Sequence, residues 1–168
     1  MSVMGKILVA EQDGVKVIKL VGDVRVALSP TLMNFVKELG CSGNLHSVIL
    51  DLTETDAIDS TSLGLMAKIS LKSQEKFHCL PTIISCKDDI NRILFSMGFD
   101  NVFVIVNDAS GAIGQLGELP TQMVSEEAMR EQVLEAHRVL MSLNSANENT
   151  FRELVEALET EQRRCVAR

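Results

Sequence analysis

Near the middle of this chain a short apolar strand gives way within a few residues to a helix. The apolar run 48–52 predicts the strand, and the apolar residues from Leu63 onward predict the helix. Ser60 and Thr61 fall between them, in or next to the first turn of that helix. The first turn of a helix leaves backbone N–H groups without partners. The segment therefore places two hydroxyl groups beside unpaired N–H donors.

Two roles are open to these hydroxyls. Ser and Thr are common caps of helix N-termini, and the residue types alone favour that role. The alternative is a phosphorylation site, because a phosphate would sit against the free N–H groups. It would also add about −1.5 to −2 charges to a junction that is already ringed by four carboxylates, those of Asp51, Glu54, Asp56 and Asp59.

The elements on either side follow an alternating order. Residues 6–10 and 15–21 predict two strands joined by a turn at Asp13-Gly14. A helix follows, with Ser29 as its cap, Pro30 in its first turn and Gly40 after its end. The rest of the alternation comprises strands at 46–52, 82–86 and 101–106, and helices after Ser60 and from Asp88-Asp89 to Gly98. This order predicts an α/β fold in which helices pack on one face of a mixed sheet.

The junction also resembles a known family. The segment Asp59-Ser60-Thr61-Ser62-Leu63-Gly64 is similar to the motif of STAS domains, the fold of bacterial anti-sigma factor antagonists, which usually reads Asp-Ser-[Ser/Thr]-Gly-Leu-Gly. Ser62 stands where the family commonly has glycine. The resemblance covers about residues 1–108, the predicted STAS domain. It implies phosphorylation on Ser60, with Thr61 as the alternative, and so reverses the preference for a cap.

The resemblance implies a function in partner switching. The unphosphorylated surface around Ser60 would bind an anti-sigma factor or serine kinase and so release a sigma factor, and a serine phosphatase would reset the state. Met66 and Ile69 are expected in the core. The expected partner-binding residues are Asp23, Arg25, Asp59, Thr61, Ser62, Leu63, Gly64 and Lys68.

The second family motif departs from its usual form. The family reads Gly-[Glu/Asp]-x-Asp near the end of the second strand, and this chain reads Gly22-Asp23-Val24-Arg25. An arginine near Ser60 would pair with a phosphate, where an aspartate would repel it. Phosphorylation would then favour a bound or autoinhibited form.

The C-terminal third has a different character. Glycines and Pro120 mark residues 109–124 as a linker, and two amphipathic helical patterns follow in residues 125–168. The first helix is expected to begin at Ser125, and residues 144–149 are expected to break the pattern before the second. This helical hairpin either covers an apolar face of the domain or binds a second protein in a groove.

Composition excludes several other functions. The net charge of −7 argues against nucleic-acid binding, and no long apolar run suggests membrane insertion. Four scattered cysteines, and the absence of a basic segment leading into an apolar one at the N-terminus, favour the cytoplasm. The three histidines lack metal-ligand spacing, so we expect no metal and no cofactor. The acidic set has neither a predicted pocket nor an electrophile stabiliser, so we expect no enzyme activity. The competing function is a constitutive STAS adaptor, an accessory subunit of a membrane transporter or of a biofilm-regulatory complex.

Overall fold

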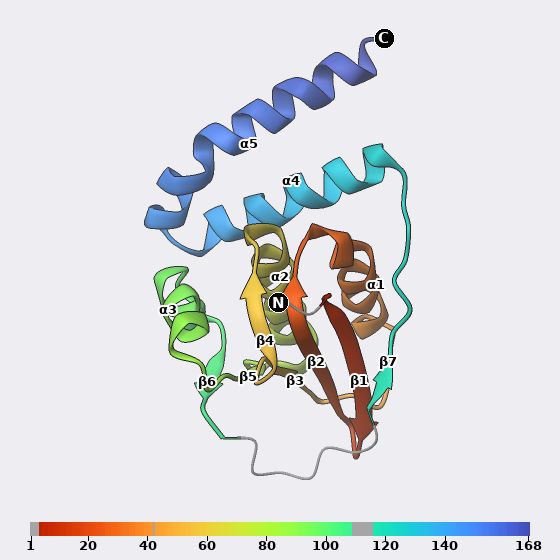
Figure 1. Ribbon diagram of the computed structural model, residues 1–168, viewed down its shortest axis with the longest axis vertical. Helices are drawn as coiled ribbons and strands as arrows, with labels where there is room; N and C mark the ends of the chain where they lie inside the picture. Colours follow the sequence, from red (N-terminus) through yellow and green to blue (C-terminus); the bar gives the residue numbers. More distant parts are fainter. Residues whose placement is uncertain (1–3, 42, 109–115) are drawn as a thin grey trace.

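A seven-stranded mixed sheet forms the centre of the protein (Figure 1). The computed structural model describes residues 4–41, 43–108 and 116–168. The strand order is β6-β5-β3-β2-β1-β7. Strand β4 pairs with the last residues of β2, past the stretch of β2 that pairs with β3. The strands are β1 (Lys6–Gln12), β2 (Val15–Val24), β3 (Ser47–Asp51), β4 (Thr55–Ile58), β5 (Thr82–Ile84), β6 (Val104–Val106) and β7 (Gly117–Glu118). Strands β2, β3, β5 and β6 run parallel to one another, and β1 is antiparallel to β2 and β7.

The N-terminal hairpin confirms the turn expected from the sequence. Asp13 and Gly14 both have positive φ angles, 53° and 78°. This is the backbone that a two-residue turn of type I′ requires. Strand β2 continues past the predicted end at Val21 to Val24, because its last residues pair with β4.

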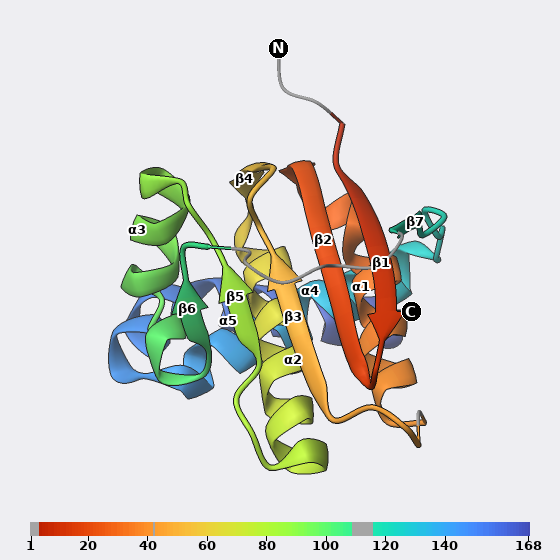
Figure 2. The ribbon, with the colours of Figure 1, turned by 90° about the horizontal axis from the view of Figure 1, so that it is seen from below.

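Helices cover one face of the sheet, as the sequence predicted (Figure 2). The helices are α1 (Ser29–Leu39), α2 (Ser60–Phe77), α3 (Asp88–Ser96), α4 (Glu126–Leu143) and α5 (Ser145–Val166). Met66 and Ile69 are fully buried, as expected, in a core that joins the inner sides of β2 and β3 to α1 and α2. The mixed α/β fold class is confirmed.

Several local expectations were wrong. Leu28 is the N-cap of α1, and the Ser29 hydroxyl, inside the helix, makes no capping hydrogen bond. Lys87 stands at the N-cap position of α3 without a side-chain capping hydrogen bond, and Asp88 and Asp89 lie within the first turn of the helix. The predicted strand 101–106 is strand only from Val104, because the short 3₁₀ helix Phe99–Asn101 precedes it.

Two strands escaped the sequence analysis. Strand β4 is four residues of mixed polarity, and it exists because it pairs with the end of β2. Strand β7 lies inside the expected linker 109–124 and adds Gly117 and Glu118 to the free edge of β1. Residues 109–115 of that linker, with Gly111 and Gly114, lie outside the described residues.

The two C-terminal helices fold back on the domain. Helix α4 was expected to begin at Ser125, and Ser125 is its N-cap. The Ser125 hydroxyl accepts a hydrogen bond from the N–H of Ala128. Helix α4 lies across α2, and α5 packs on the outer side of α4 (Figure 1). The break between them is only Asn144, which caps α5. The expected break over residues 144–149 was too long, because its polar residues form the first turn of α5.

Candidate partner-binding site at the start of helix α2

Asp59 is the N-cap of α2. One of its carboxylate oxygens accepts a hydrogen bond from the N–H of Ser62 at 2.8 Å. The other accepts from the N–H of Val26 at 2.7 Å, which fastens the end of β2 to the helix start. The alternative role, in which Ser60 or Thr61 caps the helix, is therefore wrong. A carboxylate immediately before the helix fills that role, and it leaves the Ser60 hydroxyl without a capping function.

The Ser60 hydroxyl instead contacts a histidine from the C-terminal region. Its Oγ lies 2.8 Å from Nε2 of His137 on α4. The other ring nitrogen, Nδ1, lies 2.7 Å from the carbonyl oxygen of Val133, which only accepts hydrogen bonds. In the neutral imidazole of His137, Nδ1 therefore carries the hydrogen, and the Ser60 hydroxyl donates a hydrogen bond to Nε2.

His137 is held tightly in this position. Its side chain is only 2% exposed, and its ring meets Phe151 of α5 edge-on with centroids 5.3 Å apart. Sequence reasoning missed the link between His137 and the serine motif, because the two residues are 77 positions apart. The only local signal was a histidine on the apolar side of an amphipathic helix.

The remaining motif residues are less accessible than Ser60. Ser60 is half-buried, whereas Thr61, Ser62, Leu63 and Gly64 are all buried. Thr61, the alternative phosphorylation site, is only 5% exposed. The structure therefore makes Ser60 the more accessible of the two hydroxyls.

Ser60, Gly64 and Lys68 form one stripe of α2 that faces α4. Residues four positions apart share a helix face. Ser60 bonds to His137, and the Lys68 ammonium pairs with the Glu135 carboxylate. A Cβ atom on Gly64 would clash with the backbone carbonyl of Ala136, so the two helix backbones touch at this glycine. We call these three residues the α2 stripe.

The second family motif lies beside the helix start. The N–H of Asp59 donates to the carbonyl oxygen of Val24 at 3.1 Å, which places the end of β2 next to the cap of α2. Asp23 forms an ion pair with Arg25 at 3.4 Å, and the Arg25 side chain is 62% exposed. The junction thus carries an accessible guanidinium group next to the motif.

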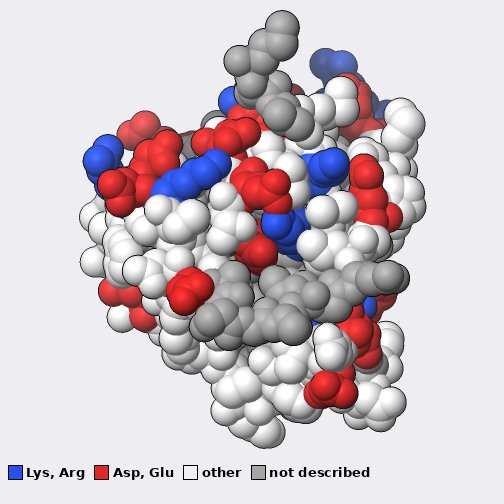
Figure 3. Space-filling model, turned by 60° about the horizontal axis from the view of Figure 1, so that its bottom comes forward, with Lys and Arg blue, Asp and Glu red and all other residues white. Residues whose placement is uncertain are grey.

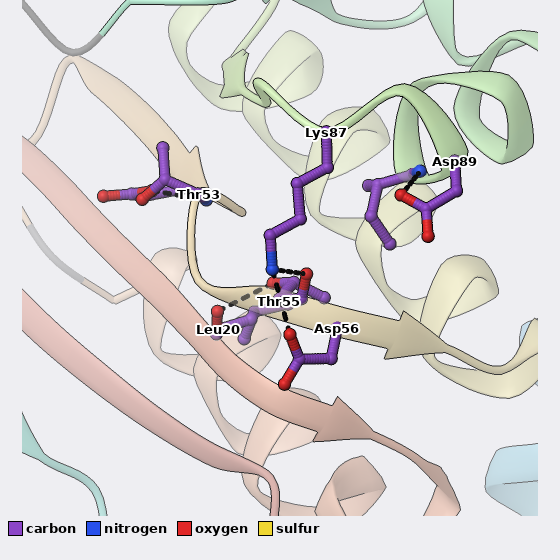
Figure 4. A network of polar contacts seen from close by, with 8 residues as sticks. Leu20, Thr53, Thr55, Asp56, Lys87 and Asp89 are labelled. Atoms are coloured by element: carbon purple, nitrogen blue, oxygen red, sulfur yellow. Dashed lines mark hydrogen bonds and ion pairs between the residues drawn. The ribbon is translucent and has the colours of Figure 1, made fainter. Parts of the chain in front are cut away.

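The other three carboxylates near the junction do not form a ring around Ser60. Asp51 accepts from the N–H and hydroxyl of Thr53. Asp56 receives the Lys87 ammonium at 2.9 Å, and Lys87 also donates to the carbonyl of Thr55 (Figure 4).

Glu54 pairs with Lys19 on the neighbouring strand. A hydrogen bond from Lys19 lowers the pKa of the Glu54 carboxyl below its ordinary value of 4.5, and the same bond raises the pKa of Lys19. On the face that Figure 3 shows, acidic and basic side chains are intermingled. Asp51 and Glu54 share the ammonium of Lys19, and Asp56 pairs with Lys87. Among the described residues no group of three or more metal-ligating side chains comes together.

The sequence matches the STAS domain family over residues 6–112, well over half of the chain. The chain belongs to the STAS domain family. The match ends before α4 begins, so the C-terminal helices lie outside it. The boundary expected at residue 108 stays a prediction.

Solved structures show the same fold. The STAS chain is similar to the crystal structure of an anti-sigma factor antagonist from Mycobacterium paratuberculosis, with a TM-score of 0.56 and 18% sequence identity. The similarity covers 65% of this chain and 92% of that one. A comparison with curated proteins finds no match.

Two further observations concern the length of the apolar helices and the cysteines. No helix in the described part of the chain is both long and apolar enough to cross a bilayer. Cys41, Cys79, Cys86 and Cys165 are all exposed free thiols.

Proposed function

We propose that this STAS protein is an anti-sigma factor antagonist whose binding is switched by phosphorylation of Ser60. Its partner is an anti-sigma factor or serine kinase in the cytoplasm, and a serine phosphatase restores the binding form. The observation that carries the proposal is the position of Ser60. It is the first residue of α2, it is half-buried rather than buried, and its hydroxyl is not used to cap the helix.

The switch works through charge. Phosphorylation replaces a neutral hydroxyl with a group of about −1.5 to −2 charges. The neighbouring carboxylate, that of Asp59, already accepts hydrogen bonds from two backbone N–H groups at the same helix end. A partner that packs against the start of α2 would then have to bury this charge, and an unpaired buried charge costs several kcal/mol. A loss of only about 1.4 kcal/mol weakens binding tenfold.

Arg25 influences how phosphorylation of Ser60 changes partner binding. Its guanidinium is accessible and forms an ion pair with Asp23. A phosphate on Ser60 offers a stronger, charge-assisted acceptor. We expect Arg25→Ala to change the ratio between partner binding of the unphosphorylated and of the phosphorylated protein, in addition to the loss of a partner-binding side chain.

The test compares tagged proteins recovered from native cells. Wild type, Ser60→Ala and Ser60→Asp are purified with their bound proteins, together with Ser96→Ala and Ser96→Asp as matched controls. Ser96 is an exposed serine at the end of α3, away from the α2 stripe. We expect one partner to bind wild type, Ser60→Ala and both Ser96 variants, and to be lost from Ser60→Asp.

Other results would point elsewhere. Identical partners for all five proteins would exclude the switch and favour a constitutive STAS adaptor of a transporter or biofilm-regulatory complex. Mass spectrometry of the protein from the same cells should place phosphate on Ser60. Phosphate on Thr61 alone would contradict the assignment of the site.

A further inference from the structure

Helix α4 already occupies the surface that the proposed function gives to the partner. All three residues of the α2 stripe contact α4, through Ser60–His137, Gly64–Ala136 and Lys68–Glu135. The partner-binding residues expected from the family motif include Gly64 and Lys68, which share this helix face with Ser60. A partner and α4 therefore cannot bind these residues at the same time.

The contact is a helix docked on a helix at close range. Gly64 has no side chain, so the Ala136 backbone lies directly against it. Ala136 and Leu140 of α4 are fully buried and join the domain core. The Ser60–His137 hydrogen bond and the Lys68–Glu135 ion pair lie at the two ends of the stripe. The face thus recognises an amphipathic helix with one small residue, one hydrogen-bond acceptor and one acid.

The contact is also incompletely sealed. An open cleft remains between α4 and the α1–α2 face, and the basic side chains of Lys37, Lys68 and Lys72 line it opposite Glu131 and Glu135. Ion pairs at such exposed positions contribute little stability. Only four residues of α4 are buried: Leu134, Ala136, His137 and Leu140. Helix α5 makes its main contact with α4 and not with the sheet. The hairpin is therefore attached through this strip of α4 and, at the start of α5, through Asn147, which donates to the carbonyl of Met97, and the core residue Phe151.

We propose that the α4–α5 hairpin covers the partner-binding face of its own chain. The partner binds by displacing the hairpin with an amphipathic helix of its own. The identity of the face as the partner site rests on the proposed function. The displaceable character of the hairpin does not. If the binding-competent open form is a minor fraction, the apparent affinity for the partner falls by that fraction. Weakening α4 without altering α2 then strengthens partner binding.

The first experiment measures hairpin release without any partner. Lys68→Cys, with Cys41, Cys86 and Cys165 replaced by serine, places a thiol under α4 and keeps Cys79 as an internal control. Cys79 is exposed just beyond the end of α2. Ala136→Arg puts a large charged side chain where the two helix backbones touch. We expect it to raise the rate at which maleimide labels the thiol introduced at position 68 about tenfold or more, with the Cys79 rate unchanged.

A milder variant guards against failure to fold. His137→Ala removes the bond to Ser60 without adding bulk, and we expect a several-fold increase in the labelling rate of the introduced thiol. An unchanged rate at that thiol in both variants would overturn the proposal. Faster labelling of both thiols together with loss of cooperative unfolding in both variants would also overturn it, because the hairpin would then be an inseparable part of the domain.

The second experiment tests competition with the partner found with the Ser60 variants. Lys68→Cys/Glu135→Cys, with the native cysteines replaced, is joined by a bismaleimide crosslinker whose spacer contains a disulfide, which ties α4 to α2 until the spacer is reduced. We expect the crosslinked protein to lose the partner, the same protein to recover it on reduction, and Ala136→Arg to hold more partner than wild type. Equal capture in the crosslinked and reduced forms would overturn the competition. If no variant binds a Ser60-dependent partner, the proposed function fails, and thiol labelling still decides whether the hairpin opens.

Discussion

At the scale of single residues, Asp59 and Ser60 at the start of α2 make different contacts. Asp59 holds the helix end and the end of β2 through its two carboxylate oxygens. Ser60 is thereby free to hold α4 through His137. The Ser60 hydroxyl is therefore not needed to satisfy the first N–H groups of the helix.

This difference in contacts predicts different stabilities for variants of the two residues. Asp59→Ala removes the cap and leaves the N–H of Val26 without its acceptor. We expect a loss of about 1–3 kcal/mol in the free energy of unfolding. Ser60→Ala removes one half-buried hydrogen bond and should cost about 0.5–1.5 kcal/mol. Urea unfolding followed by circular dichroism measures both. A larger loss for Ser60→Ala than for Asp59→Ala would contradict the assignment of the cap.

The Lys19–Glu54 pair predicts a small dependence of stability on pH. The folded pKa of Glu54 is lowered, so the pair stabilises the protein above the ordinary carboxyl pKa of 4.5 and is lost as the pH falls through the lowered value. Lys19 has a folded pKa raised above its ordinary value of 10.5, so the same stabilisation is present below pH 10.5 and is lost as the pH rises through the raised value.

Glu54→Gln tests this dependence. The Glu54 side chain is 59% exposed, so we expect a loss of at most about 0.5 kcal/mol at neutral pH. The difference in the free energy of unfolding between Glu54→Gln and wild type should disappear when urea unfolding is repeated below the lowered pKa of Glu54. A difference that persists there would show that packing, and not charge, links the two side chains.

At the scale of elements, Asn147 joins three helices. It is 3% exposed, and its side-chain amide donates to the carbonyl of Met97 just after α3 and to that of Leu140 in α4. Its own N–H donates to the side chain of Asn144, the cap of α5. The start of α5 is therefore fixed to the domain by polar contacts as well as by packing.

Asn147→Ala should release this attachment. It removes the amide donor from the Leu140 carbonyl and leaves the Met97 carbonyl with only the longer bond from Asn144, so we expect a loss of about 1–3 kcal/mol in the free energy of unfolding. Asn149→Ala, an exposed asparagine in the same helix, is the matched control and should change stability by less than about 0.5 kcal/mol. Equal effects of the two variants in urea unfolding would refute this role.

At the scale of the whole molecule, we expect the free energy of local opening to decrease from the sheet outward through α4 to α5. The central strands β2 and β3 pair on both sides and carry fully buried residues. Helix α4 rests on α2, and the C-terminal end of α5 is exposed. Local opening needs the least free energy where few buried contacts hold the backbone.

Hydrogen exchange should follow this order. We expect backbone amides after Val155 in α5 to exchange first, those of α4 next, and those of β2 and β3 last, in mass-spectrometric exchange of the full chain. Ala136→Arg should speed exchange in α4 and α5 and leave β2 and β3 unchanged. Exchange in α4 that is as slow as in β2 would contradict the order.

The sequence alone determined the parts of this protein that depend on neighbours in the chain. The Asp13-Gly14 hairpin, the alternation of strands and helices and the C-terminal helix expected from Ser125 follow from turn chemistry, apolar periodicity and helix-start signals, and the Asp59–Gly64 motif was recognised by its resemblance to a family. Each of these signals acts over a few residues, so a single stretch of sequence carries it. The mixed sheet with helices on one face followed from their order.

The tertiary structure decided which of these local groups meet. Strands β4 and β7 exist only because partner strands offer free N–H and C=O groups to two or four residues of weak strand propensity. Asp59 excluded Ser60 from the cap because its carboxylate reaches both Ser62 and Val26, and the second contact is invisible in the local sequence. The bond from Ser60 to His137 spans 77 residues and depends on two helix backbones touching at Gly64. No local periodicity encodes such a contact, because it arises only when separate elements pack.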